Sequence, residues 1–187
     1  MLSRKILNVP NVLTTARLLL AIAAFALIPL RCFWPAFVVF VVAAATDWVD
    51  GYWARRYGQV TQVGRIYDPF VDKILVCGAF IFLAAEQHSG IVAWMAVVVV
   101  AREMLVTGLR GFIEQHGGDF SAKMSGKLKM VFQCIAVGAS LVALTYGTAG
   151  PPVWIQWTLL AAVWLAVLTT IWSGVQYVVI AAKFMCG

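Results

Sequence analysis

Charge is scarce in this chain. Only 12% of its 187 residues are Asp, Glu, Lys or Arg, whereas 63% are hydrophobic. A soluble domain has about twice that charged fraction and only about 45–50% apolar residues. A chain of this length also leaves much of its surface in contact with solvent. The composition therefore excludes a soluble globular domain, and we expect an integral membrane protein.

Closely spaced cysteines and long polar segments are also missing. The four cysteines, Cys32, Cys77, Cys134 and Cys186, lie far apart and form no CxxC motif. This spacing argues against a thiolate metal centre or a redox motif, and we expect buried thiols. Without long polar segments there is no room for a separate soluble domain, so we expect one membrane domain over residues 1–187.

Six apolar segments predict an all-α fold, with six transmembrane helices in a bundle. They cover about residues 13–30, 35–57, 68–85, 91–113, 127–147 and 153–182. The clearest pair lies in 130–182, which holds 53 residues without a charge, interrupted only by a turn at 146–152 with two prolines. Before the first helix, we expect the short segment 1–9 to lie at the membrane interface.

The basic residues fall on one side of this arrangement. The net charge is +6, but the 14 Lys and Arg are spread among apolar segments. Nucleic-acid binding needs a continuous basic face, so we expect no nucleic-acid partner. With six spans the two termini share a side, and that side receives every Lys and Arg except Arg31. The positive-inside rule predicts cytoplasmic termini and cytoplasmic loops at 58–67 and 114–126, in a bacterial cytoplasmic membrane.

Half of the acidic residues fall in one short stretch. Asp47, Asp50, Asp68 and Asp72 are four of the eight, at the cytoplasmic ends of two expected spans. The members of each pair share a helix face, and the two pairs can face each other across an antiparallel hairpin. Four neighbouring carboxylates need protons or cations to offset their repulsion. Divalent metal is the simplest answer, and oxygen ligands suit Mg²⁺ or Mn²⁺ better than Zn²⁺.

Small residues accompany these aspartates. Gly51 and Ala54 follow Asp47, and Gly64 precedes Asp68 by four positions. They clear space beside the carboxylates for a bulky ligand that carries phosphates, and Arg55 is available to meet its charge. The alternative is that they are helix-packing residues beside solvated charges.

The whole pattern resembles a known signature. Asp47-x-x-Asp50-Gly51-x-x-Ala54-Arg55 is followed by eight residues, then Gly64-x-x-x-Asp68-x-x-x-Asp72. These eight fixed residues over 26 positions resemble the complete motif of the CDP-alcohol phosphatidyltransferases. The resemblance implies six transmembrane helices, a homodimer, and two divalent metal ions held by the four aspartates at a cytoplasmic site. It also implies that Asp72 is the catalytic base, while Gly51, Ala54, Arg55 and Gly64 bind CDP-diacylglycerol.

Within that family the chain is most similar to the phosphatidylglycerophosphate synthases. The similarity rests on residues 11–17, 101–110, 126–129 and 169–177, although Met130 stands where relatives often have Thr. It implies transfer of a phosphatidyl group from CDP-diacylglycerol to sn-glycerol 3-phosphate, with release of CMP. A cardiolipin synthase or an inositol phosphate transferase of the same family is the alternative. A divalent-cation conduit is more remote, because its carboxylates would lie near mid-bilayer.

An acceptor that carries a phosphate needs cations. Arg102 and Arg110 lie eight residues apart on the expected fourth helix, and Lys127 opens the fifth. We expect these three to bind the acceptor phosphate. Arg102 has the alternative of pairing with Glu103 or with lipid headgroups. Lys129 could complete the pocket beside Lys127, and for both lysines the alternative is that they set the topology.

Two further sets of polar residues lie on expected helices. Asn11, Thr14 and Arg17 are spaced by three, and we expect them to line the pocket, although helix capping also explains Asn11. Thr169, Ser173 and Tyr177 form a stripe on the sixth helix, which we expect to bond across helices rather than to substrate.

Overall fold

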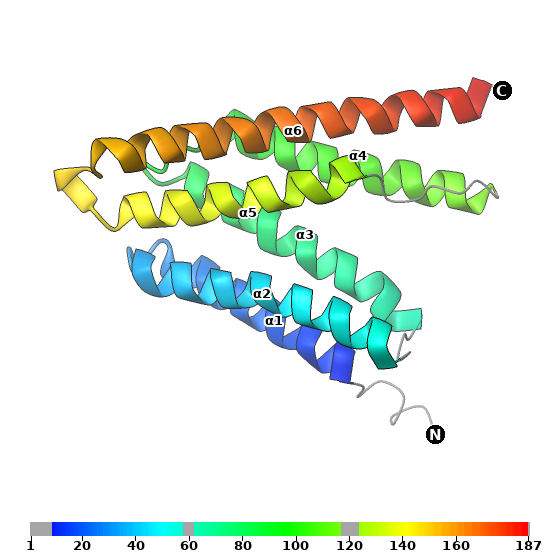
Figure 1. Cartoon of the computed structure of the whole chain (residues 1–187), viewed down its shortest axis with the longest axis horizontal. Coiled ribbons are helices and arrows are strands. Elements are labelled where there is room, and N and C mark those ends of the chain that lie inside the picture. Colours follow the sequence, from blue (N-terminus) through cyan, green and yellow to red (C-terminus); the bar gives the residue numbers. More distant parts are fainter. Residues whose placement is uncertain (1–8, 58–61, 117–123, 187) are drawn as a thin grey trace.

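The computed structural model describes residues 9–57, 62–116 and 124–186; of these, the side chains of 9–11, 47–57, 62–66, 114, 124, 125, 127, 148 and 186 lie outside the description. In this part the chain forms six α-helices and no strand, as the sequence predicts (Figure 1). They are α1 (Val9–Leu27), α2 (Phe33–Tyr57), α3 (Gln62–Ala84), α4 (Ala93–Gln115), α5 (Met124–Leu144) and α6 (Val153–Cys186), with a short 3-10 helix η2 (Gly147–Ala149) between the last two.

Most helix ends lie within a few residues of the expected ones, but α3 begins earlier. It starts at Gln62 rather than at Asp68. Hydropathy detects only the apolar part of a helix, and α3 continues beyond it into polar sequence. Pro69 lies inside this helix, where it donates no backbone hydrogen bond. Asp68 and Asp72 therefore project from within a helix rather than from its first turn.

Consecutive helices run in opposite directions (Figure 1). The first residues of α1, α3 and α5 and the last residues of α2, α4 and α6 lie at one end of the molecule, at the right of Figure 1. We call this the polar end, because Asp68 and Asp72 lie near it. The turns at 28–32, 85–92 and 145–152 lie at the opposite end.

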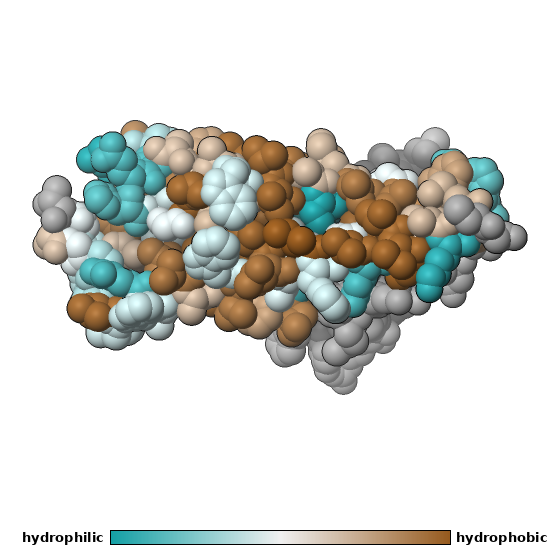
Figure 2. All heavy atoms as spheres, turned by 90° about the horizontal axis from the view of Figure 1, so that it is seen from above, coloured by the Kyte–Doolittle hydropathy of each residue, from teal (hydrophilic) through white to brown (hydrophobic). Residues whose placement is uncertain are grey.

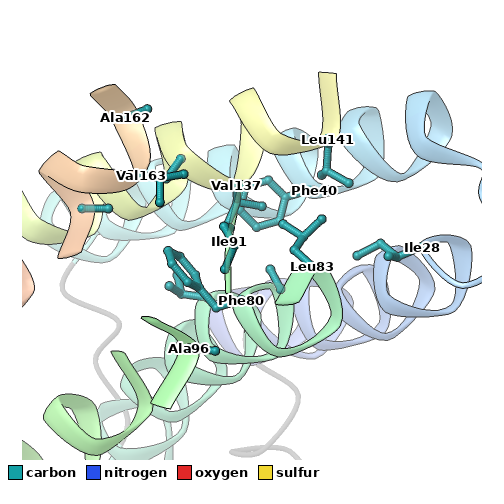
Figure 3. Close-up of a cluster of buried hydrophobic side chains, with 14 of the residues drawn as sticks. Ile28, Phe40, Phe80, Leu83, Ile91, Ala96, Val137, Leu141, Ala162 and Val163 are labelled. Atoms are coloured by element: carbon teal, nitrogen blue, oxygen red, sulfur yellow. The ribbon is translucent and has the colours of Figure 1, made fainter. Parts of the chain in front are cut away.

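The core lies around α3, which packs on α1, α4 and α5. Phe80 and Leu83 of α3 are fully buried, and Figure 3 shows them beside side chains such as Phe40 of α2 and Val137 of α5. Close approach of α1 and α3 depends on Gly78. A Cβ atom added there would lie 2.3 Å from Cζ of Phe25. This contact is one of those that set how α1 sits against α3.

The outer surface is strongly apolar. Large side chains such as Leu19, Val97, Met104 and Trp172 are exposed on different helices. Figure 2 shows apolar residues along the middle of one face, with most hydrophilic residues nearer its two ends. Contiguous apolar surface of this kind marks contact with a membrane or with other proteins.

One helix in the described residues is long and apolar enough to cross a membrane, over Val153–Met185. The apolar stretches Val12–Leu27, Phe33–Thr46 and Leu128–Leu144 are shorter. The helix count agrees with the expected bundle, whereas the six membrane crossings stay a prediction. The expectation of buried cysteines is wrong for Cys32, which is exposed in the turn between α1 and α2, while Cys77 and Cys134 are half-buried.

Candidate active site

Helix α1 is the main neighbour of the aspartates on α3. It packs extensively on both α2 and α3, whereas the described residues of α2 and α3 contact each other little. Asp68 and Asp72 thus lie against α1. The side chains of Asp47 and Asp50 lie outside the described residues, so the expected facing of the two pairs stays a prediction.

Each described aspartate accepts a hydrogen bond from α1. Thr14 Oγ1 donates to Asp68 Oδ1 over 2.5 Å. Arg17 Nη1 donates to Asp72 Oδ1 over 2.6 Å and forms an ion pair with it. Thr14 and Arg17 are buried, while the Asp72 side chain keeps 22% of its surface exposed. The aspartates are accessible, and the groups that hold them are not.

The matching of α1 and α3 follows from helix periodicity. Thr14 and Arg17 are three residues apart on one face of α1, and Asp68 and Asp72 are four apart on one face of α3. The two helices run in the same direction, so both contacts form in one register. That register continues to the Phe25 contact with Gly78.

Lys73 connects α3 to α4 beside the aspartates. Its Nζ donates to Thr107 Oγ1 over 2.6 Å, and the Thr107 hydroxyl in turn donates to the Glu103 carbonyl over 2.6 Å. In the sequence, Lys73 contributes only to the charge count that sets topology.

A second group of charges lies between α4, α5 and α6, and we call it the Glu103 cluster. It consists of Arg102, Glu103, Lys129, Ser173 and Tyr177. Glu103 Oε1 accepts from Arg102 Nη1 at 3.1 Å and also from Lys129 Nζ. Arg102 Nε donates to Ser173 Oγ at 3.0 Å, and its Cζ lies 5.3 Å from the centre of the Tyr177 ring. The cluster holds two buried cations for one carboxylate.

The Glu103 cluster changes how several predicted residues are interpreted. Arg102 pairs with Glu103, which is one of the two expected alternatives to acceptor binding. The binding of an acceptor by Arg102 stays a prediction. Lys129 is buried and ion-paired, so it does more than set topology. Ser173 bonds across helices, as expected. Thr169 differs, because its hydroxyl donates to carbonyl groups of its own helix.

The sequence offers Lys129, beside Lys127, as a possible part of the acceptor pocket, but it does not single out Glu103 as a site residue. The available signal is the position of Glu103 in an apolar helix, where a charge is expensive unless it is paired. Its partner Lys129 is 26 residues away, and local spacing does not reveal such a contact.

The other predicted residues are only partly described. Arg110 is half-buried, two turns beyond Arg102 on α4. The backbone is helical at each of the remaining predicted residues, but their side chains lie outside the described residues. They are Gly51, Ala54, Arg55, Gly64, Asn11 and Lys127.

The described carboxylates are suitable ligands for a divalent metal ion. Asp68 and Asp72 present carboxylate oxygens one turn apart, which is the ligand type that Mg²⁺ and Mn²⁺ prefer. Asp68 and Asp72 are the two motif aspartates whose side chains are described. Among the described side chains, no three potential metal ligands lie together. Hydrogen bonds from α1 orient both carboxylates, as is usual around metal ligands.

The chain matches a known protein family over most of its length. A model of the CDP-alcohol phosphatidyltransferase family matches residues 7–172. The chain belongs to this family. The match includes the aspartate motif, both α1 residues that bind it, Glu103 and Lys129, and it ends just before Ser173.

Curated members of the CDP-alcohol phosphatidyltransferase family are similar over almost the whole chain. Proteins from Escherichia coli K12, Shigella flexneri serotype 5b and Shigella boydii serotype 4 are each 34% identical over 175 residues. The alignments cover 91% of this chain and 92% of each relative. Each relative is a CDP-diacylglycerol–glycerol-3-phosphate 3-phosphatidyltransferase. The resemblance inferred from the sequence is confirmed.

Proposed function

We propose that the chain transfers a phosphatidyl group from CDP-diacylglycerol to sn-glycerol 3-phosphate, giving phosphatidylglycerophosphate and CMP. The observation that carries this proposal is the pair Asp68 and Asp72. Both belong to a complete family motif, and both are held by buried α1 side chains while staying accessible. The names of the similar proteins support the same reaction.

Two divalent ions, Mg²⁺ or Mn²⁺, are part of the proposal. Asp47, Asp50, Asp68 and Asp72 would hold them, because these four supply only carboxylate oxygens. Bound there, the ions offset the negative charge of the pyrophosphate and of the departing CMP. Gly51, Ala54 and Gly64 leave room for CDP-diacylglycerol beside these carboxylates, and Arg55 adds a cation.

The reaction needs a base close to the acceptor hydroxyl. The hydroxyl oxygen forms a bond to the phosphorus that carries diacylglycerol, and the bond from that phosphorus to the CMP oxygen breaks. We assign the proton to Asp72, which then returns it to solvent. A positioned base of this kind contributes about 10²–10⁴-fold to the rate.

The acceptor phosphate is assigned to cations of α4 and α5. Arg102, Arg110 and Lys127 are the proposed contacts. The Glu103 cluster holds two cations and one carboxylate. This excess positive charge supports the assignment of the acceptor phosphate to α4 and α5, because an arriving phosphate would balance Arg102 and Lys129 together. An uncharged polyol would bring no such compensation.

We further propose that all six helices cross the membrane, with both termini and the polar end in the cytoplasm. The helices have 19 to 34 residues, and 19 residues extend about 28 Å at 1.5 Å per residue. A hydrocarbon core is about 30 Å thick. The charge distribution supports the orientation. A homodimer rests on the family resemblance alone.

An acceptor panel tests the proposed function. Purified protein receives CDP-diacylglycerol, Mg²⁺ and one of four acceptors: glycerol 3-phosphate, glycerol, phosphatidylglycerol or inositol phosphate. CMP release and the lipid product are measured. We expect turnover with glycerol 3-phosphate alone. Preference for phosphatidylglycerol or inositol phosphate would instead identify the corresponding alternative. Absence of CMP release, combined with divalent-cation flux into vesicles, would support a conduit.

A further inference from the structure

Arg17 is the largest fully buried side chain in the described residues. Its charge lies in a helix that is otherwise almost entirely apolar. Burying a guanidinium costs several kcal/mol unless partners compensate for the lost water. Polar groups around Arg17 must therefore replace the water that its guanidinium loses on burial.

The Arg17 guanidinium connects three helices. From α1, its Nη1 donates to Asp72 Oδ1 of α3 over 2.6 Å, and its Nε donates to Thr46 Oγ1 of α2 over 3.3 Å. Thr46 is itself oriented, because its hydroxyl donates to the Ala43 carbonyl over 2.6 Å. One rigid planar group thus touches the helix segments that carry both halves of the aspartate motif.

The position of Thr46 makes this connection specific. It directly precedes Asp47, the first residue of the motif, while Asp72 is the last. Among the described residues, α2 and α3 contact each other little, so what lies between them there contributes to their relative placement. Arg17 lies there, and the Thr14 bond to Asp68 adds a second contact from the same face of α1.

Stability alone does not account for an arginine at this place. Apolar residues of similar volume often replace a buried ion pair without loss of stability. The planar fork of Arg instead fixes direction at two partners at once, which Lys cannot do. Active groups that must be placed to within about 0.5 Å need supports of this kind.

We infer that Arg17 is a positioning residue for the proposed transfer reaction, and that Thr46 sets the orientation of its guanidinium. Arg17 holds Asp72 at a fixed place relative to the α2 half of the motif, without itself touching substrate. This inference rests on the proposed function, since Asp72 is there the base and a metal ligand.

The experiment compares three variants of the full-length protein. Arg17→Lys keeps the charge and loses the fork, while Thr46→Val removes only the hydroxyl that accepts from Nε. Thr170→Val is the matched control. Its buried hydroxyl likewise accepts one side-chain hydrogen bond, from Gln133 at 2.8 Å, and donates to a carbonyl of its own helix.

We expect kcat to fall about 10–100-fold in Arg17→Lys and about 3–10-fold in Thr46→Val. The KM of both substrates should stay within about twofold, because transition-state geometry changes rather than ground-state binding. Binding of Mn²⁺ to the purified protein, measured by electron paramagnetic resonance, should weaken about tenfold in Arg17→Lys. Thr170→Val should lose thermal stability and keep both its kcat and its Mn²⁺ affinity.

Two results overturn the inference. In the first, Arg17→Lys and Thr46→Val resemble the control, losing stability while kcat and Mn²⁺ affinity persist, so that Arg17 is only structural. In the second, a KM rises at constant kcat, so that Arg17 binds substrate directly. If wild-type protein transfers no phosphatidyl group, the proposed function fails, and the Mn²⁺ titration alone then decides whether Arg17 positions the aspartates.

Discussion

Replacing Glu103 with Gln tests how the charges between α4, α5 and α6 are balanced. The substitution keeps the shape of the side chain and removes the one carboxylate that Arg102 and Lys129 share. The side chains of these three residues are each less than 10% exposed, so the water that reaches them only partly replaces the lost partner. Two buried cations would then remain side by side.

The magnitude follows from that burial. Removing one partner of a buried ion pair costs about 3–5 kcal/mol. For a chain of this size, this corresponds to a fall in Tm of about 6–20 °C. Thermal unfolding in detergent, followed by the fluorescence of the eight tryptophans, measures the change. Glu86→Gln, at the opposite end of the bundle, is the control, and its Tm should change little.

Glycerol 3-phosphate should rescue the Glu103→Gln variant in part, because its phosphate supplies the missing negative charge. At a ligand concentration of about 100 times Kd, binding stabilises the folded state by about 2.7 kcal/mol. The rise in Tm should be larger in the variant than in wild type at equal ligand concentration, and glycerol should have no effect. A variant as stable as wild type, or one rescued equally by glycerol, would refute the assigned charge balance.

Three other predictions test separate parts of the structure. Gly78→Val should lower the free energy of unfolding by about 1–3 kcal/mol through overpacking against Phe25. A variant with the same free energy of unfolding as wild type would disprove the close contact between α1 and α3. Arg110→Lys should raise the KM for glycerol 3-phosphate about tenfold while that for CDP-diacylglycerol stays constant; equal effects on both would make Arg110 structural. In a background without native cysteines, single cysteines at Gln59 and Ala149 should react with impermeant reagents from opposite sides of the membrane, and labelling from one side only would contradict the topology.

Much of the fold can be predicted from the sequence because its signals are local. Long apolar runs bounded by charges and prolines locate all six helices, and the turn at 146–152 separates α5 from α6 as expected. The predicted start of α3 is too late, because a helix that extends into polar sequence loses the hydropathy signal. The aspartate motif is equally local, since its residues span only 26 positions.

The contacts that organise the site are not local. Thr14 meets Asp68 across 54 residues, and Arg17 meets Asp72 across 55. The sequence indicates two polar faces of suitable spacing, but not that α1 packs on both α2 and α3. Likewise, Arg102 and Ser173 are 71 residues apart, and their bond depends on the packing of α4 on α6.

Metal-dependent transfer to glycerol 3-phosphate at the aspartate site is the reaction to measure. Its most direct test follows radiolabelled glycerol 3-phosphate into lipid, with purified protein and CDP-diacylglycerol, in wild type and in Asp68→Asn. Wild type should form labelled phosphatidylglycerophosphate in step with CMP release, and a chelator should abolish this until Mg²⁺ or Mn²⁺ is restored. Asp68→Asn should insert and purify normally but show no transfer, because the amide keeps the shape without the charge that binds metal. Transfer that persists under chelation, or near-normal turnover by Asp68→Asn at limiting metal, would show that the aspartates do not hold a metal needed for transfer.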